Sequence, residues 1–574
     1  MSLGWQSRAH QPAVNGRFLR AKRARGRTVE PLPPTRVIAS GESRMSARRL
    51  ARAFAFAFAL LPLSALAREP QAKPQESASR IHRYWAAPHT SMTRGVVTIN
   101  GKRIKFIGDA GTIILRDKQG KPTGEMFYVA YMKRGGNPAR RPISFLYNGG
   151  PGSSSVWLHM GAFGPMRVVT RSHSHTPPAP YRLVNNDYSL LDASDLVFVD
   201  AMGTGFSRIL GSAEGGAGTP KMFYGVDADG QAFAQFVGKF LSQYGRWNSP
   251  KYLIGESYGT ARSAVLANIL EQQDNIDLNG VVLLSSILDF DTAIDTPNFN
   301  PGVTLPYALA LPTYAAVAWY HKALANPPAT LHPWLDKVQA WAMGPYLQAL
   351  NRGGLLPEAR KDAIAKQMAA FTGLPVSYVL RADLRVTGPE FEQALLLPRG
   401  ETTGRLDARF SGPTMDPLAE SAAYDPQSAA ISAAYTSAFN DYVRRVLKFG
   451  GSHTYKIISS AVGNDWSFQH VLPGQPAAIG FIGTNVLPDL AAAMSYNPDL
   501  KVMVNAGYFD LATPYYAAVY QMRQLPMVAR LQRNIDYRFY HTGHMIYVRP
   551  RSLAHLHANI VQFIRRTAYP PGSG

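Results

Sequence analysis

The chain contains no cysteine among its 574 residues, and this absence excludes several kinds of chemistry. Without cysteine there is no disulfide, no thiolate metal site, no thiol nucleophile and no lipid-bearing cysteine anchor. Charged residues are also sparse, at 17% of the chain. With 46% hydrophobic and 11% aromatic residues, the composition instead predicts a globular protein whose large core is held by packing alone.

The net charge of +22 is spread unevenly along the chain. Residues 1–67 carry twelve Lys or Arg and two Asp or Glu, so they supply +10 of that charge. No dense basic run follows residue 67, which predicts a mildly basic, solvated surface. Binding to nucleic acid is therefore not expected.

The segment that begins at Met45 has the layout of a secretory signal. A basic start is followed by an apolar run over residues 53–63 and by a small-x-small site that ends at Ala67. The apolar run is too short to cross a bilayer comfortably. We expect translation to start at Met45, with 1–44 upstream, and cleavage after Ala67. The mature protein is then periplasmic or secreted, without a stable membrane anchor.

Residues 68–80 are polar and contain proline, which is typical of a linker. In 81–290, short alternating segments between residues 96 and 132 predict antiparallel strands joined by hairpins. Continuous apolar runs follow, beginning near residues 143, 195, 251 and 280. Such runs are typical of parallel strands that are buried on both faces.

Residues 291–455 lose this strand rhythm and become rich in alanine, with helical stretches near 311–324, 335–350, 357–371 and 428–448. Strand patterns return near residues 501 and 537, so the sheet resumes in 456–574. This order predicts an α/β-hydrolase fold, which is a mostly parallel sheet between helices, with a helical cap inserted at 291–455.

The sequence G-E-S-Y-G, from Gly255 to Gly259, lies between an apolar strand and a helical stretch. A serine on such a sharp turn points its hydroxyl out of the sheet, and the flanking glycines avoid collisions with neighbouring backbone. Ser257 is therefore the candidate nucleophile.

A serine hydroxyl needs a base, and in this fold the chain order is serine, acid, histidine. His544 in H-T-G-H-M follows the last strand and is the candidate base, with His541 as its rival. Asp510 ends a strand between the serine and the histidine and is the candidate acid. Asp200 also follows a strand, but it precedes the serine and is interpreted as structural.

An oxyanion hole requires backbone N–H groups directed at the developing charge. The sequence N-G-G-P-G, from Asn148 to Gly152, follows a strand and offers backbone that side chains do not cover. We assign the N–H groups of Gly150 and Tyr258 to this role.

Five motifs, in order, resemble the serine carboxypeptidase family: N-G-G-P-G-S-S-S, D-A-M-G-T-G-F-S, G-E-S-Y-G, A-G-Y-F-D and H-T-G-H-M. The resemblance implies the same fold and cap. It also implies Ser257, Asp510 and His544 as the triad and Gly150 and Tyr258 as oxyanion donors. Residues that match the family's contacts to a substrate's terminal carboxylate are Asn148, Gly149 and Glu256.

Two positions depart from the family pattern. Ser153 stands where the family usually has a disulfide cysteine, and Ala162 stands where it usually has a glutamate that shares a proton with the residue matching Glu256. Without that second carboxyl, we expect Glu256 to lose the largest upward shift of its pKa.

The leading functional hypothesis is an exported, cofactor-free and metal-free carboxypeptidase that acts on peptides or small proteins through an acyl-enzyme. An esterase or acyltransferase on the same scaffold is the alternative, because an acyl-enzyme can react with any nucleophile that the pocket admits. A third hypothesis is a binding protein whose triad is vestigial.

Overall fold

The computed structural model describes residues 89–135, 137–480 and 483–569. The predicted upstream segment, signal, cleavage site and linker, at 1–80, lie outside the described residues. No helix in the described ranges is long and apolar enough to cross a membrane.

A 10-stranded sheet forms the centre of the structure, and two small two-stranded sheets lie apart from it. The strands are β1 (Thr90–Ile99), β2 (Lys102–Arg116), β3 (Pro122–Lys133), β4 (Ile143–Tyr147), β5 (Met166–Val168), β6 (Leu183–Asn185), β7 (Asp195–Val199), β8 (Arg208–Ile209), β9 (Lys251–Glu256), β10 (Gly280–Leu284), β11 (Glu401–Thr403), β12 (Ser411–Pro413), β13 (Lys501–Gly507) and β14 (Ile535–Tyr540).

The strand order in the large sheet is β1-β2-β3-β7-β4-β9-β10-β13-β14, with β8 paired to β3. The first three strands form an antiparallel meander, and β3 is also antiparallel to β7. From β7 to β14 every neighbouring pair is parallel. Both strand types predicted from the apolar patterns are therefore present, and the α/β fold class is confirmed.

The helices are α2 (Val226–Gln243), α3 (Tyr258–Gln272), α4 (Leu305–Tyr320), α5 (Leu331–Trp341), α6 (Leu347–Arg352), α7 (Glu358–Thr372), α8 (Val376–Arg381), α9 (Gly388–Ala394), α10 (Pro426–Arg445), α11 (Ser460–Asp465), α12 (Leu487–Tyr496), α13 (Tyr515–Arg523) and α14 (Pro550–Thr567). A short π-helical segment, η3, spans Leu158–Phe163.

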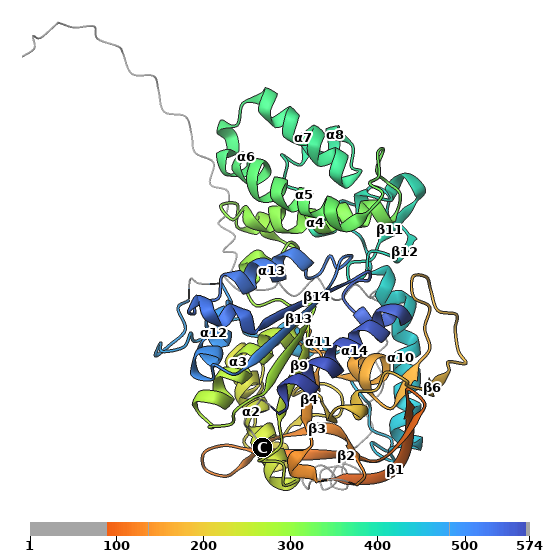
Figure 1. Ribbon diagram of the computed structural model, residues 1–574, viewed down its shortest axis with the longest axis vertical. Coiled ribbons are helices and arrows are strands. Elements are labelled where there is room, and N and C mark those ends of the chain that lie inside the picture. Colours follow the sequence, from red (N-terminus) through yellow and green to blue (C-terminus); the bar gives the residue numbers. More distant parts are fainter. Residues whose placement is uncertain (1–88, 136, 481–482, 570–574) are drawn as a thin grey trace, which may run out of the picture. The chain divides into compact units, whose positions relative to one another are not determined.

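Each face of the sheet has its own core, because side chains alternate along a strand. On β3, Met126 and Tyr128 join the core formed with α2, α3 and α12. Phe127 and Val129 point the other way, into the core formed with α10 and α14. Figure 1 shows α2, α3 and α12 on one side of the strands and α14 on the other.

A third core lies among helices α4 to α9, within the predicted insertion. It extends to Tyr508 and Phe509 just beyond β13, and α4 packs against α13 (Figure 1). Helix α10 belongs to the same predicted insertion but packs differently, since Ile431 and Phe439 join a core of the sheet. The boundaries at 291 and 455 stay predictions, but the insertion has two differently packed parts.

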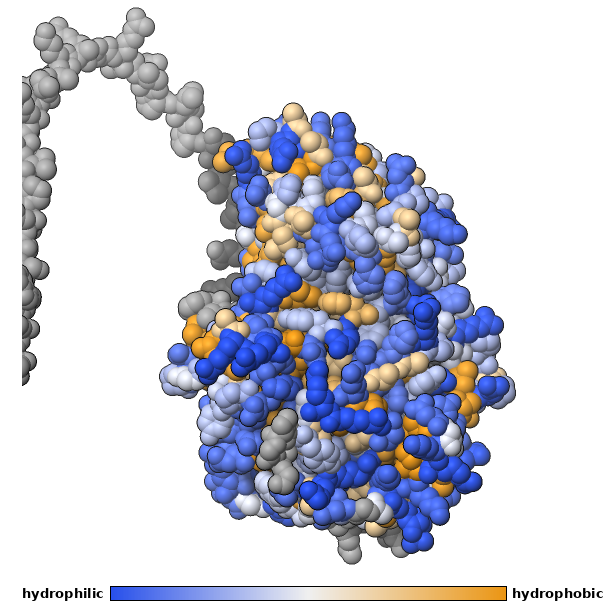
Figure 2. Space-filling view, viewed as in Figure 1, coloured by the Kyte–Doolittle hydropathy of each residue, from blue (hydrophilic) through white to orange (hydrophobic). Residues whose placement is uncertain are grey.

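The surface in Figure 2 is mostly hydrophilic, with apolar side chains in small, scattered groups. Large apolar residues that are strongly exposed, such as Leu355 and Leu418, lie far from one another in sequence. Scattered apolar residues are normal on a folded protein, so this face gives no sign of an extensive binding patch.

Candidate active site

Ser257 lies at the sharp turn between β9 and α3. Its φ of 61° is unusual for a residue with a side chain, and such strain is held only where the surroundings fix it. The glycines of the turn are required sterically. A Cβ at Gly255 would lie 2.2 Å from the carbonyl oxygen of Gly259, and one at Gly259 would lie 2.9 Å from that of Tyr147. The turn therefore presents the Ser257 hydroxyl beyond the end of the sheet.

The loops after β13 and β14 bring Asp510 and His544 together. The Nδ1 atom of His544 lies 2.8 Å from Oδ2 of Asp510, and both residues are buried. Asp510 Oδ1 accepts hydrogen bonds from the N–H groups of Ala512 and Thr513, at 3.0 and 2.9 Å. The Thr513 hydroxyl donates to Oδ2 at 2.7 Å. Both carboxylate oxygens are thus held in place.

Burial opposes a charge on His544, but the negative charge of Asp510 and its hydrogen bond outweigh this, so the pKa of His544 is raised. Among the described residues, neither Nε2 of His544 nor Oγ of Ser257 has a hydrogen-bond partner. Both residues line one cavity of about 220 Å³. The cavity therefore contains a serine and a histidine whose reactive atoms are available to a substrate.

The backbone of His544 is fixed on both sides. Its N–H donates to the carbonyl of Leu406 at 2.6 Å, and the Ser285 hydroxyl donates to its carbonyl at 2.7 Å. The rival base, His541, lies outside the cavity lining, and its ring packs against those of His332 and Tyr508. The structure thus brings His544, and not His541, to the Ser257 cavity.

The loop after β4 packs tightly against the nucleophile turn. A Cβ at Gly149 would lie 2.4 Å from the Tyr258 nitrogen, so only glycine permits this approach. Gly150, with φ of 108°, lines the cavity beside Ser257. No hydrogen bond within the described residues uses the N–H of Gly150 or Tyr258. The N–H groups of both predicted oxyanion donors are therefore free to bind a substrate oxygen, and both lie close to the nucleophile.

Glu256 is also buried at this cavity, and its two oxygens differ. Oε1 accepts from the Asn148 side-chain amide at 2.6 Å and from the Tyr547 hydroxyl at 3.1 Å. Oε2 is buried without a partner among the described residues. A buried oxygen without a partner is costly unless the carboxyl carries a proton or a ligand supplies the missing hydrogen bond.

Burial raises the pKa of Glu256 to about 7, although the charge of His544 and the hydrogen bonds from Tyr547 and Asn148 lower it. The sequence prediction considered only the missing second carboxyl and left out desolvation by burial, which is the largest influence on this pKa. Glu256 therefore keeps its proton up to about neutral pH. A carboxyl in this state can donate a hydrogen bond from Oε2.

Ala162 lies in η3 and is fully buried in the core on the α14 side of the sheet. It does not line the Ser257 cavity. A glutamate at this position would place a carboxyl in an apolar core, at a cost in stability. Ala162→Glu is consequently expected to destabilise the fold without placing a second carboxyl in the cavity.

Several supporting residues were missed by the sequence analysis. The buried Arg262 pairs with Asp229 at 2.6 Å and donates to the Asn148 carbonyl at 2.8 Å. Thr513 and Tyr547 each lie three residues after a predicted site residue, but that spacing alone does not reveal their hydrogen bonds. Asp200, which the sequence analysis interpreted as structural, accepts from the Ser155 N–H at 2.8 Å and holds the loop after β4.

Within the described ranges, no group of three or more His, Asp or Glu side chains is placed to hold a metal ion.

Three comparisons with known proteins bear on these observations. The serine carboxypeptidase family model matches residues 110–304, a range that includes Ser257 and the loop after β4 but neither Asp510 nor His544. Serine carboxypeptidase-like 34 from Arabidopsis thaliana is 25% identical over 202 residues, covering 33% of this chain and 36% of that protein. Serine carboxypeptidase-like 33 is 27% identical over 157 residues, covering 27% and 30%.

The chain thus spans about a third of the length of these curated relatives. Among solved structures, a prohormone-processing carboxypeptidase from Saccharomyces cerevisiae is similar with a TM-score of 0.50 and 16% identity, covering 80% of this chain and 91% of that one. This likeness bears on the fold. The predicted resemblance is confirmed: over residues 110–304 the chain is similar to the serine carboxypeptidase family, and its α/β-hydrolase fold is shared with the yeast structure.

Proposed function

We propose that this chain is a serine carboxypeptidase that removes residues from the free C-termini of peptides. The observation that carries the proposal is the presence of Ser257, His544 and Glu256 in one cavity, with Asp510 bonded behind the histidine. A nucleophile, a base and a carboxyl that can donate a hydrogen bond are the groups that this reaction requires.

Acylation begins when Ser257 Oγ attacks the carbonyl carbon of the last peptide bond while Nε2 of His544 takes its proton. The Gly150 and Tyr258 N–H groups stabilise the negative charge that develops on the carbonyl oxygen. His544 then protonates the leaving amine, and the C–N bond breaks. Water, deprotonated by His544, hydrolyses the resulting ester and restores Ser257.

A free C-terminus distinguishes this substrate from other amides and esters. Protonated Glu256 can donate from Oε2 to the terminal carboxylate, which supplies the partner that this oxygen lacks in the structure. The Asn148 amide and the Gly149 backbone lie in the same cavity and are assigned to the same carboxylate. Asn148 has a second amide hydrogen beside the one donated to Glu256.

The pKa values set the direction of the pH dependence. Glu256, with a pKa raised by burial to about 7, becomes an anion as the pH rises through that value and then repels the substrate carboxylate. His544, with its raised pKa, is protonated at low pH and cannot accept the serine proton. Cleavage of free-acid peptides is therefore expected to peak between these limits, and cleavage of uncharged esters is expected to lack the fall near pH 7.

We also propose that the protein is exported, which rests on the signal-like residues 45–67. Mass spectrometry of the protein made in a bacterial host is expected to find Arg68 as the first residue in the periplasmic or secreted fraction. Recovery of residues 1–44 in an intracellular form would contradict this.

The activity test compares matched peptides. Blocked peptides with free-acid or amidated C-termini, and an uncharged ester with the same acyl group, are incubated with the enzyme and with Ser257→Ala. Release of the last residue from the free acid alone, absent in the variant, supports the carboxypeptidase. Rapid ester hydrolysis with neither peptide cleaved would favour the esterase, and no turnover of any substrate would contradict both.

A further inference from the structure

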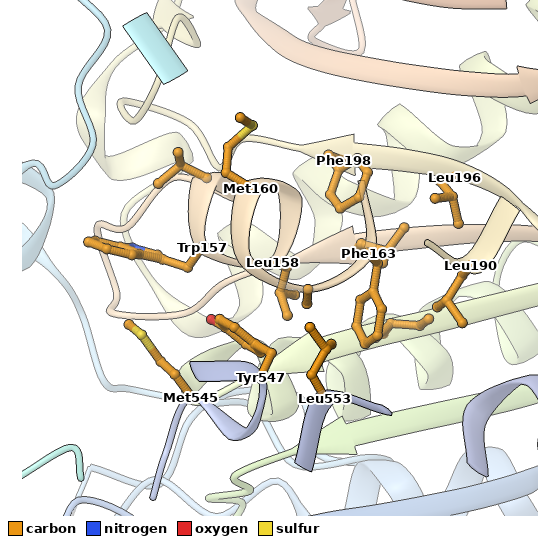
Figure 3. Packing of buried hydrophobic residues seen from close by; sticks show 14 of the residues in the cluster. Trp157, Leu158, Met160, Phe163, Leu190, Leu196, Phe198, Met545, Tyr547 and Leu553 are labelled. Atoms are coloured by element: carbon orange, nitrogen blue, oxygen red, sulfur yellow. The ribbon is translucent and has the colours of Figure 1, made fainter. Parts of the chain in front are cut away.

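One wall of the Ser257 cavity is apolar and comes from segments far apart in sequence. It consists of Trp157, Leu406, Ile431 and Met545, all of which line the cavity. Each is at most 8% exposed, so these side chains are held firmly by the core behind them. Figure 3 shows Trp157, Met545 and Tyr547 lying together at one end of that core.

Helix α10 supplies its part of the wall from one face. Ile431 and Ser432 follow Ser428 by three and four residues, and Tyr435 follows Ile431 by four, so all four residues share one face of the helix. The first three line the cavity, and the Tyr435 ring lies 4.9 Å from that of Trp157.

This wall stands at the Glu256 end of the cavity. A Cβ at Gly161 would lie 2.2 Å from the Tyr435 hydroxyl and 2.7 Å from the Tyr547 ring, so the two tyrosines meet there. Tyr547 in turn donates to Glu256. A substrate whose carboxylate reaches Glu256 therefore places its last side chain beside this wall.

The cavity offers that side chain no charged partner. Among its lining residues only Glu256 and His544 ionise, and both are engaged in the reaction. Asp425 lies beside Ser428, but its oxygens accept from Arg405 N, Gln427 N, Ser428 N and Ser428 Oγ. A lysine, arginine, aspartate or glutamate side chain entering the cavity would lose water without gaining an ion pair.

We propose, on the basis of the carboxypeptidase activity inferred above, that the enzyme selects peptides whose last residue is uncharged and apolar. The wall formed by Trp157, Ile431 and Met545 recognises this side chain, and α10 determines the selectivity. Ser432 is the adjustable position, because it is half-buried, lines the cavity and has no ionisable group beside it on this face of α10.

The test introduces a charge at Ser432. Rates (kcat/KM) are measured for blocked dipeptides that differ only in a last residue of leucine, lysine or glutamate. The wild type is expected to favour leucine over either charged residue by roughly tenfold or more. Ser432→Asp should raise the lysine-to-leucine ratio by roughly tenfold, and Ser432→Lys should do the same for glutamate.

Ser437→Asp is the matched control, because it makes the same change on an exposed part of α10 that does not line the cavity. It should keep the wild-type ratios. Labelling of Ser257 by a fluorophosphonate shows which variants are folded. One folded Ser432 variant is enough to show whether a charge at this position changes the selectivity for the last residue.

Equal rates for all three peptides in the wild type, or identical ratios in the Ser432 and Ser437 variants, would overturn this selectivity and leave the carboxypeptidase standing. Failure of the wild type to cleave any free-acid peptide would instead overturn the proposed function itself.

Discussion

His544 and His470 are both buried and both bonded to aspartates, but in different ways. His544 contacts Asp510 through Nδ1 and leaves Nε2 at the cavity. His470 lies in the segment between α11 and α12 and uses both nitrogens. Its Nδ1 is 2.5 Å from Asp227 and its Nε2 is 2.7 Å from Asp489.

This difference makes His544 suitable as a general base, whereas His470 is a structural residue that links two helices, here called the clamp. Burial lowers the pKa of His470, but the hydrogen bonds and charges of Asp227 and Asp489 outweigh it and raise the pKa to about 9. A histidine held this way stays protonated at neutral pH and ties its loop to α2 and α12. His544 has one aspartate and one available nitrogen, which a general base requires.

The largest loss of activity is expected from removing Ser257, the nucleophile that His544 serves as base. Ser257→Ala should lower turnover by about 10⁴-fold or more, because no acyl-enzyme can form, while the free energy of unfolding changes little. Steady-state rates and thermal unfolding measure the two quantities. A fully active Ser257→Ala protein would contradict the serine mechanism.

Changing the aspartate of each pair sharpens the comparison. Asp510→Asn should lower kcat on the order of a thousandfold, because an amide no longer selects the productive tautomer of His544 or stabilises its positive charge. Asp489→Asn makes the same change at His470 and should leave kcat within about twofold. Equal losses in the two variants would break the distinction between the two histidines.

Glu256 is a second carboxyl near His544, yet it bonds Asn148 and Tyr547 instead of the ring. Glu256→Gln cannot ionise and should abolish the fall in free-acid peptide cleavage above pH 7. One pH unit above a pKa of about 7, the wild type retains roughly a tenth of its protonated Glu256. The pH profile of kcat/KM measures this, and an unchanged profile in the variant would exclude Glu256 as the titrating group.

Thr513 is the hydroxyl that accompanies the Asp510–His544 pair, lying 2.7 Å from Asp510 Oδ2 and 3.2 Å from His544 Nδ1. Thr513→Val keeps the shape and removes the hydrogen bond, and it should lower kcat by about tenfold with a small change in KM. Thr513→Ser should restore most of the rate. A loss that serine does not rescue would indicate a packing role.

The smallest effect is expected at the clamp. Since the folded pKa of His470, about 9, exceeds the unfolded value of about 6.5, its stabilisation is complete below the lower value and is lost as pH rises through the higher one. His470→Gln should lower Tm by about 1–2 °C at neutral pH and by less above pH 9. A pH-independent difference in Tm would contradict the ion-pair account.

Local patterns were sufficient to predict much of the site. Ser257 was found because a glycine-flanked serine between a strand and a helix has a steric meaning, and Asp510 and His544 were found because they follow the strand patterns near residues 501 and 537. The antiparallel meander and the parallel strands were likewise predicted from local patterns of apolar residues. These features depend on residues that are close in sequence.

What escaped prediction depends on contacts between distant segments. The Tyr547 hydroxyl reaches Glu256 across 291 residues, and His470 meets Asp227 across 243. The pKa of Glu256 follows from burial, which a pattern of residue types does not measure. Likewise, the packing of α10 against a core of the sheet follows from Ile431 and Phe439 meeting residues that its own sequence does not identify.

The most direct test of the account is the location of a fluorophosphonate label in the wild type, His544→Ala and His470→Gln, determined by peptide mapping. The account predicts a label on Ser257 in the wild type, at least a thousandfold slower labelling in His544→Ala, and a nearly normal rate in His470→Gln. A label on another serine, or rapid labelling of folded His544→Ala, would contradict it.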